Sequence, residues 1–200
     1  MDNLLKIVKQ TIVNEQEALA VVQENLQSDM IEILEVIDQC RGKIVFSGVG
    51  KSGHIGKKLA ATYSSLGIPA IFVHSTEAVH GDLGMIGSDD VVILLSNSGE
   101  TSEVLATIPS IKKIGSTLIA FTSKKDSSLA FGCDYQLIYT YEKEADSLNL
   151  APTTSAIIML SIGDAIAVGI SEHRHFTATD FALYHPGGSL GAQLKESQEE

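Results

Sequence analysis

A hydroxyl-rich hexapeptide, Ser96-Asn97-Ser98-Gly99-Glu100-Thr101, follows the longest β-branched apolar run of the chain, Val91–Leu95. The run is typical of a strand buried on both faces of a parallel sheet, and apolar residues recur at helical spacing over 102–115 despite Pro109. The hexapeptide therefore leads into a helix N-terminus, where unpaired N–H groups and the helix dipole favour anions. We expect these N–H groups to bind a phosphate monoester together with the hydroxyls of Ser96, Ser98 and Thr101. Alternatively, the hydroxyls only cap the helix.

A glycine-rich turn with the pattern Gly48-x-Gly50-x-x-Gly53 follows the first predicted strand. The spacing matches a dinucleotide-binding fingerprint, but the second strand ends in His74 and not in the acidic residue that would bind ribose. Gly50-Lys51-Ser52 resembles the end of a phosphate-binding P-loop, but Val45 occupies the position of its first glycine. What remains is a tight turn that directs Lys51 toward the strand ends. Alternatively, Lys51 is an ordinary surface residue.

Two carboxylates and a histidine could transfer protons at this edge of the sheet. Glu103 lies in the first turn after the hexapeptide, Glu144 follows the fifth predicted strand, and His185 precedes the turn Pro186-Gly187-Gly188. A positioned acid and base near neutral pH are what proton transfer between adjacent carbons requires. The alternatives are that Glu103 only complements the helix dipole, and that His185 is an inert residue of a terminal loop.

Four histidines, His54, His74, His80 and His185, raise the question of a metal site. They form no His-x-x-x-His pair on a predicted helix, and His74 and His80 lie in a loop. We therefore expect no obligatory metal or other cofactor, and only adventitious, inhibitory zinc binding at His74. His54 is expected on a helix surface.

Alternating strands and helices indicate an α/β fold. Strands are expected at 43–47, 69–74, 91–95, 117–122 and 135–139, and helices at 52–66, 101–115, 127–131 and 153–172. This alternation favours a five-stranded parallel sheet between helices, a three-layer sandwich, with the flavodoxin-like strand order 2-1-3-4-5. Ligands bind at the carboxyl ends of the strands in such sheets, which is where the polar residues cluster.

The N-terminal segment, 1–40, is predicted to form one or two amphipathic helices with a break near Ser28, where a cap is available. Its apolar stripe has more surface than one sheet face needs. We expect it to contribute to a subunit interface, although it could instead only cover the sheet.

The composition predicts one soluble, cytoplasmic domain over 1–200. The chain has 200 residues, 44% of them hydrophobic, and no linker-like segment. Its formal net charge of −11 argues against nucleic acid and anionic membranes as partners. Cys40 and Cys133 have no CxxC spacing, which is typical of a reducing compartment, and we expect no signal peptide or membrane span.

Five segments together resemble the sugar isomerase (SIS) domain of bacterial D-arabinose 5-phosphate isomerases over nearly the whole chain. They are GVGKSGHIG at 48–56, FVHSTEAVHGDLGMI at 72–86, SNSGETSE at 96–103, LAPTTS at 150–155 and FALYHPGGSLG at 181–191. The resemblance implies the same parallel sheet, a small-molecule sugar phosphate as partner and a homotetramer. It also implies interconversion of D-ribulose 5-phosphate and D-arabinose 5-phosphate through a cis-enediol, as in Kdo and lipopolysaccharide biosynthesis. Typical members continue into paired CBS domains, whereas this sequence stops at Glu200, either because it is a truncated piece or because it is a single-domain form.

The resemblance also implies roles for individual residues. Catalytic positions of the family match Lys51, Glu103, Glu144 and His185. Either carboxylate would transfer the proton between C1 and C2, His185 would assist ring opening or move protons between oxygens, and Lys51 would stabilise the enediolate. The residues expected to bind substrate are Gly48, Ser52, His74, His80, Ser96, Asn97, Ser98, Thr101, Thr153, Thr154 and Ser155.

Two other functions stay open. The same phosphate site would serve an SIS isomerase acting on hexulose 6-phosphate or sedoheptulose 7-phosphate. A non-catalytic module that senses sugar phosphates is the second alternative, although Glu103, Glu144 and His185 fit turnover better than sensing.

Overall fold

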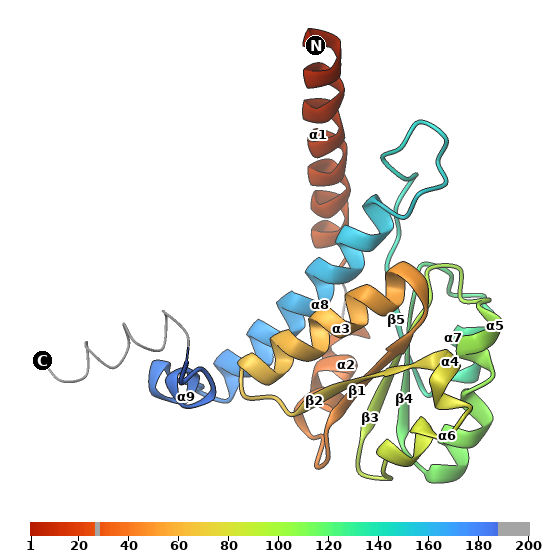
Figure 1. Ribbon diagram of the computed structural model, residues 1–200, viewed down its shortest axis with the longest axis vertical. Helices are drawn as coiled ribbons and strands as arrows, with labels where there is room; N and C mark the ends of the chain where they lie inside the picture. Colours follow the sequence, from red (N-terminus) through yellow and green to blue (C-terminus); the bar gives the residue numbers. More distant parts are fainter. Residues whose placement is uncertain (27–28, 188–200) are drawn as a thin grey trace, which may run out of the picture.

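Five parallel strands form the centre of the molecule in the computed structural model (Figure 1), which describes residues 1–26 and 29–187. The strands are β1 (Ile44–Gly48), β2 (Ala70–His74), β3 (Val91–Leu95), β4 (Thr117–Thr122) and β5 (Tyr135–Ile138). Their order is β2-β1-β3-β4-β5, which confirms the predicted topology. Gly48 pairs with both His74 and Leu95, so β2, β1 and β3 end level with one another. The loops that follow these strands therefore start at one edge of the sheet.

Helices precede, connect and follow the strands. They are α1 (Asp2–Asn25), α2 (Asp29–Asp38), α3 (Gly50–Ser65), α4 (Ser75–Ala78), α5 (Ser102–Leu105), α6 (Ile108–Ile114), α7 (Ser128–Gly132), α8 (Thr154–His173) and α9 (Ala178–Tyr184), with the 3₁₀ helix η1 (Asp82–Met85). The sequence does not predict α4, η1 or α9, because segments of 4 to 7 residues are too short to show a period. The N-terminal helices break between Asn25 and Asp29, as predicted, whereas the expected cap Ser28 lies outside the described residues.

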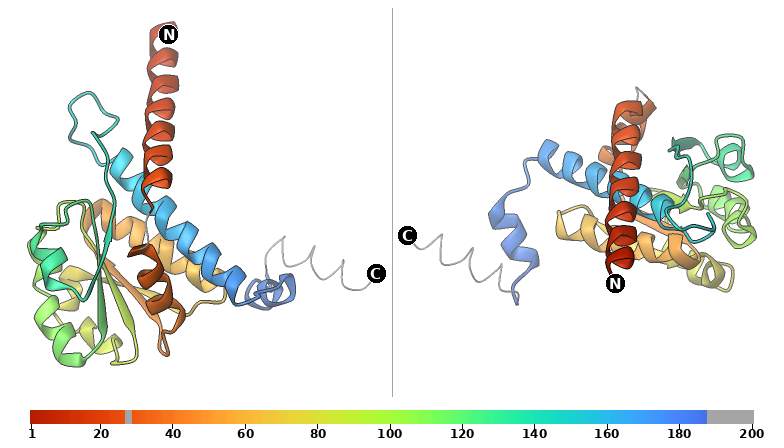
Figure 2. Two further views of the ribbon diagram at one scale, coloured as in Figure 1. Left: turned by 180° about the vertical axis from the view of Figure 1, so that it is seen from behind. Right: turned by 90° about the horizontal axis from the view of Figure 1, so that it is seen from above.

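Helices cover both faces of the sheet, which confirms the three-layer sandwich (Figures 1 and 2). Alternate strand residues such as Phe46 and Ile93 belong to one apolar core, with Leu59 of α3 and Ile158 of α8. Their neighbours in the strands belong to a second core, which includes residues of α5, α6 and α7. Because β3 has a core on each side, all of its residues are buried, as its uninterrupted apolar run predicts.

The helix predicted over 101–115 is two helices, so this prediction is wrong. α5 ends at Leu105, α6 begins at Ile108, and Pro109 lies in the first turn of α6. Proline has no N–H, and its ring clashes with the carbonyl four residues earlier, here that of Leu105. It is tolerated at a helix start, and the break before α6 gives Pro109 that position.

The two longest helices have different surroundings. Among the described residues, α8 alone is long and apolar enough to span a membrane by length and composition, with a mean hydropathy of 1.7, but 56% of that stretch is buried within the protein. α8 therefore has the burial of a core helix. α1 instead projects away from the sheet (Figure 1), and Val22 is its one buried residue. Most of the apolar stripe of α1 thus faces away from the core of this chain.

Candidate functional site

The loop 96–101 connects β3 to α5, as predicted, and hydrogen bonds between its own residues stabilise its shape. The buried Ser96 hydroxyl accepts a hydrogen bond from the Gly99 N–H at 3.0 Å and lies 2.8 Å from the Thr101 hydroxyl. Gly99 has a φ of +68°, and a Cβ there would overlap the side chain of Ser127. Ser98 is exposed. The Ser98 hydroxyl accepts a hydrogen bond from the Glu100 N–H at 3.2 Å. All three hydroxyls expected to bind phosphate therefore also maintain the shape of the loop, and Ser98 is the most exposed of the three residues.

Glu103 is an exposed residue in the first turn of α5, directly after this loop. Its carboxylate accepts a hydrogen bond from the Ser102 hydroxyl at 2.9 Å. The backbone N–H of Glu103, and then the Ser102 hydroxyl, hold the pKa of Glu103 below its ordinary value. The Thr101 side chain does not cap α5, and the Val104 N–H instead donates to the Thr101 carbonyl oxygen at 3.1 Å.

The glycines of the β1–α3 turn have a packing reason. A Cβ on Gly48 would lie 3.1 Å from the Leu95 carbonyl oxygen, and a Cβ on Gly53 would lie 3.1 Å from that of Gly48. The glycine spacing thus allows α3 to start close to the strands, and this packing accounts for the glycines without a bound dinucleotide. Lys51 is exposed in the first turn of α3, and Ser52 beside it is half-buried. Both residues lie at the sheet edge that carries the loop 96–101.

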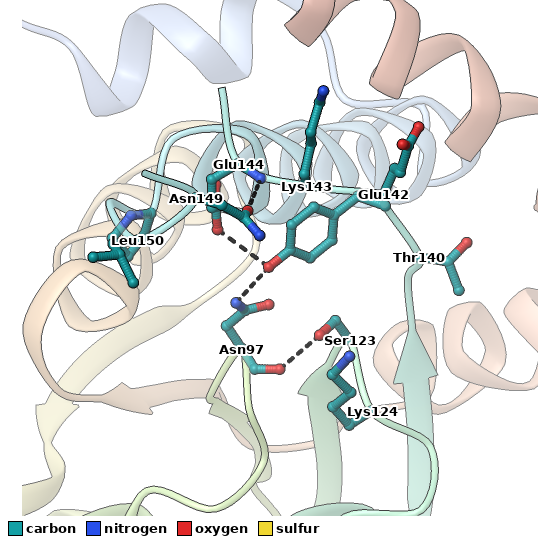
Figure 3. A pocket seen from close by; sticks show the side chains of 11 residues that line it. Asn97, Ser123, Lys124, Thr140, Glu142, Lys143, Glu144, Asn149 and Leu150 are labelled. Atoms are coloured by element: carbon teal, nitrogen blue, oxygen red, sulfur yellow. Dashed lines mark hydrogen bonds between the residues drawn. The ribbon is translucent and has the colours of Figure 1, made fainter. Parts of the chain in front are cut away.

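A chain of hydrogen bonds runs from Tyr139 through Asn97 and Tyr141 to Glu144. Figure 3 shows its part from Asn97 to Glu144. The Tyr139 hydroxyl donates to Asn97 Oδ1 at 2.9 Å, and Asn97 Nδ2 donates to the Tyr141 oxygen at 2.8 Å. The Tyr141 hydroxyl in turn donates to Glu144 Oε1 at 3.1 Å. The Asn97 amide, which we expected to bind substrate, is therefore directed at β5 and the segment that follows it.

Glu144 is a buried carboxylate at the start of α8, with 6% of its surface exposed. Its two oxygens accept five hydrogen bonds, from the Tyr141, Ser155 and Thr153 hydroxyls and from the Thr153 and Ser155 N–H groups. Burial would raise the pKa of Glu144, but the donors of Ser155, Thr153 and Tyr141 outweigh burial and hold that pKa below its ordinary value. Thr154 is buried between Thr153 and Ser155. The hydroxyls of Thr153 and Ser155 are thus directed at Glu144 and not at the loop 96–101.

The segment between β5 and α8 is ordered by its own polar groups. Asp146 accepts hydrogen bonds from the N–H groups of Leu148, Leu150 and Ala151. Asn149, with a φ of +54°, accepts one from the Glu144 N–H at 2.7 Å. This segment and the strand ends enclose a polar cavity of about 360 Å³ (Figure 3), lined by Asn97, Ser123, Lys124, Thr140, Tyr141, Glu142, Lys143, Glu144, Asn149, Leu150 and Pro152.

Sequence reasoning did not single out Tyr139, Tyr141, Lys124 or Asn149. The two tyrosines had a usable signal, because they alternate at the end of the last strand, where side chains two residues apart share a side. Lys124 follows β4 in the same way that Lys51 follows β1. Asn149 had no such signal, because its contact with Glu144 depends on the path of the whole segment.

His74 and His80 lie at the carboxyl edge of the sheet, but they do not form a metal-binding group with other residues that the structure describes. His74 ends β2 and is half-buried, and its Nδ1 accepts a hydrogen bond from the Thr76 N–H at 3.3 Å, which caps α4. His80 is exposed after α4. Within residues 1–26 and 29–187, no three histidine, cysteine, aspartate or glutamate side chains are grouped as a metal would require.

His185 lies at the opposite end of the domain from Lys51. Its Nε2 is 3.3 Å from the hydroxyl of Ser65, the last residue of α3, and its Nδ1 is 2.8 Å from the Phe181 carbonyl oxygen. Lys51 and Ser65 are separated by most of α3, or about 21 Å at about 1.5 Å per residue. Within one chain, His185 therefore does not meet Lys51 or the loop 96–101. Part of the turn expected after His185 lies outside the described residues.

Comparisons with known proteins agree with this fold. The SIS domain family matches residues 37–169. The arabinose 5-phosphate isomerase KdsD of Escherichia coli K12 is 48% identical over 186 residues, which are 93% of this chain and 57% of KdsD. The arabinose 5-phosphate isomerase KpsF of Escherichia coli is 45% identical over 192 residues, 96% of this chain and 59% of KpsF. The chain thus spans under two thirds of the length of these curated relatives.

A solved structure matches along its whole length. The Escherichia coli CFT073 protein determined in complex with arabinose 5-phosphate is 51% identical and superposes with a TM-score of 0.91 over 92% of this chain and 98% of that one. The similarity therefore extends across the sheet and the loops at its carboxyl edge. On this identity and coverage, the chain belongs to the SIS domain family.

Proposed function

We propose that this protein is an aldose–ketose isomerase that interconverts D-ribulose 5-phosphate and D-arabinose 5-phosphate through a cis-enediol. The observation that carries the proposal is the 51% identity, over 98% of its length, to a protein determined in complex with arabinose 5-phosphate. The curated relatives named arabinose 5-phosphate isomerase support it further. The loop 96–101, with Ser98 exposed beside the start of α5, has the chemistry that a terminal phosphate needs.

Within this proposal, the phosphate is bound by the Ser98 hydroxyl, the N–H groups of α5 and the hydroxyl of Ser52 at the start of α3. Lys51, exposed in the same turn as Ser52, stabilises the negative charge that develops on the enediolate oxygen. His74 and His80 contribute contacts to the sugar from the loop after β2. No step requires a metal, and we propose that zinc at His74 acts only as an inhibitor.

We assign proton transfer between C1 and C2 to Glu103 and not to Glu144. Glu103 is exposed and its carboxylate has few donors, and its lowered pKa keeps it ionised at neutral pH, as a base must be. Glu144 accepts five hydrogen bonds, so protonating it would break bonds that hold the start of α8. Its role in this proposal is to position the segment after β5, together with Thr153 and Ser155.

His185 enters the proposed mechanism from a second copy of the chain. It contacts Ser65 at the far end of α3, about 21 Å along that helix from Lys51 of its own chain. A subunit interface is also favoured by α1, whose apolar side chains are largely exposed, with Leu4 at 56% and Ile12 at 60%. We propose a homo-oligomer, a homotetramer by analogy with the family, in which His185 of one subunit assists ring opening in the next.

The test is a direct isomerase assay on D-ribulose 5-phosphate, with D-arabinose 5-phosphate quantified by chromatography, with and without a chelator. We expect turnover in both conditions, and Glu103→Gln should lower kcat by at least about 10²-fold because the base is lost. The matched control is Glu35→Gln, which removes an exposed carboxylate on α2 that lines neither the cavity nor the loop 96–101. A panel of pentose, hexose and heptose phosphates decides the substrate.

Three results would contradict parts of this proposal. Faster turnover of a hexulose or heptulose phosphate than of D-ribulose 5-phosphate would show that the substrate is not a pentose phosphate. Binding of arabinose 5-phosphate without turnover would make the protein a sensor. Mixing Glu103→Gln with His185→Ala should restore activity in mixed oligomers, because a site with both native residues can form. Absence of restored activity in oligomers that demonstrably mix would place both residues in one subunit's site.

A further inference from the structure

The Tyr139–Asn97–Tyr141–Glu144 chain links two elements that are far apart in sequence. Asn97 belongs to the loop after β3, whereas Glu144 precedes α8. We propose that Tyr141 is a positioning residue that couples the phosphate-binding loop 96–101 to the start of α8. The inference rests on the proposed function in one respect, namely that this loop binds the substrate phosphate.

The donors of this chain have a single consistent direction. An ionised carboxylate only accepts, so the proton of the Tyr141 hydroxyl must be directed at Glu144 Oε1. The Tyr141 oxygen is then left to accept, and it does so from Asn97 Nδ2 at 2.8 Å. The Asn97 amide oxygen accepts in turn from Tyr139 at 2.9 Å. The hydroxyl of Tyr141 therefore sets which way the Asn97 amide faces.

Asn97 also attaches the loop 96–101 to the end of β4, next to the hydrogen bond from the Ser96 N–H to the Phe121 carbonyl oxygen. Its carbonyl oxygen accepts hydrogen bonds from the Thr122 and Ser123 hydroxyls at 3.1 and 2.8 Å, and from the Ser123 N–H at 3.2 Å. The next residue is Ser98, which carries the accessible hydroxyl. With its carbonyl bound to β4 and its side chain bound to the tyrosines, Asn97 can move little, and this fixes the position of Ser98.

Removing the Tyr141 hydroxyl would take one hydrogen bond from each of two groups. Asn97 Nδ2 would lose its bond to the Tyr141 oxygen, and Glu144 Oε1 would lose one donor while it keeps the Ser155 hydroxyl. The Asn97 side chain could then rotate and the loop would lose one of its attachments. Because Tyr141 acts through Asn97 and not on the reacting carbons, ground-state and transition-state binding should weaken equally. The expected signature is a raised KM with kcat nearly unchanged.

The experiment compares Tyr141→Phe with Tyr139→Phe and Tyr135→Phe. Tyr135 begins β5, the strand that Tyr139 and Tyr141 follow, and it lies outside the hydrogen-bonded chain, so it controls for the loss of a tyrosine hydroxyl. Three quantities are measured for each variant: KM and kcat for ribulose 5-phosphate, and the affinity for inorganic phosphate by calorimetry. We expect Tyr141→Phe to raise KM and to lower the phosphate affinity, each about tenfold. Tyr139→Phe should change both in the same direction by about threefold, and Tyr135→Phe should leave both unchanged.

The outcomes separate this inference from its competitors. Unchanged KM and phosphate affinity in Tyr141→Phe would overturn the coupling. An effect of Tyr141→Phe without any effect of Tyr139→Phe would overturn it too, because Tyr141 lines the cavity and would then contact the substrate directly. If Tyr141→Phe does not fold, Tyr139→Phe decides alone. An inactive wild-type protein would refute the isomerase proposal, whereas phosphate calorimetry would still test the coupling.

Discussion

Substitution of Gly99 by alanine tests whether the shape of the phosphate loop depends on one glycine. Gly99 has a φ of +68°, where a residue with a Cβ is strained by about 1–2 kcal/mol. The added Cβ would also overlap the Ser127 side chain and lie 3.1 Å from the Thr122 hydroxyl oxygen. Forcing a methyl group into such a packed position typically costs about 1–3 kcal/mol. We expect Gly99→Ala to lower the free energy of unfolding by about 3 kcal/mol.

Two other glycines separate strain from overlap. Gly50 has a φ of +56° with nothing within 4 Å of a Cβ, so Gly50→Ala carries the strain alone and should cost about 1 kcal/mol. Gly169 lies inside α8 with no positive φ and an open Cβ position, so Gly169→Ala should stabilise the protein by about 0.5–1 kcal/mol.

The assay is urea unfolding followed by circular dichroism, at one protein concentration for all three variants. Phosphate affinity of Gly99→Ala is measured in parallel and should fall, because the Gly99 carbonyl also accepts a hydrogen bond from the Leu129 N–H at 3.0 Å and must move. The reasoning is refuted if Gly99→Ala unfolds at the same urea concentration as Gly50→Ala, since overlap with Ser127 would then have no cost.

Buried polar groups give three further predictions. Glu144→Gln should cost about 2–3 kcal/mol at pH 7. Because the pKa of Glu144 is lowered in the folded state, its carboxylate stabilises the protein above the unfolded-state pKa, near 4.3, and this stability is lost as the pH falls through the folded-state pKa. The urea midpoints of wild type and variant should therefore converge in acid. A difference that stays constant with pH would contradict this role. Asp90→Asn should cost about 2 kcal/mol by urea unfolding, because Asp90 accepts hydrogen bonds from the Gly87 and Lys43 N–H groups and from Lys43 Nζ, whereas the exposed Asp89→Asn should stay within about 0.5 kcal/mol. Burial, and then the charge of Asp134, raise the pKa of the half-buried Cys133 thiol to about 12. Mass spectrometry should therefore find that iodoacetamide at pH 8 alkylates Cys133 far more slowly in the folded than in the unfolded protein, and equal rates would count against the raised pKa.

Local patterns in the sequence predicted the sheet well. Val91–Leu95 is a strand with the predicted bounds, because five consecutive apolar residues can be buried only where both faces of a strand are covered. Strands that alternate with helices leave few topologies, and the observed strand order is the predicted one. The position of Ser98, Glu103 and Lys51 at one edge follows from the same rule, since parallel strands end on the same side.

The tertiary structure decided what each polar side chain does. Glu103 and Glu144 were equivalent candidates in the sequence, yet one is exposed and the other accepts five hydrogen bonds. His185 lies within the segment 181–191, which resembles the family's, but its distance from Lys51 depends on the length and direction of α3. Periodicity reports which face of an element is apolar, because burial recurs with the geometry of the backbone. The partner of a hydrogen-bonding group has no such period, since it is set by where distant segments meet, and only the folded chain determines it.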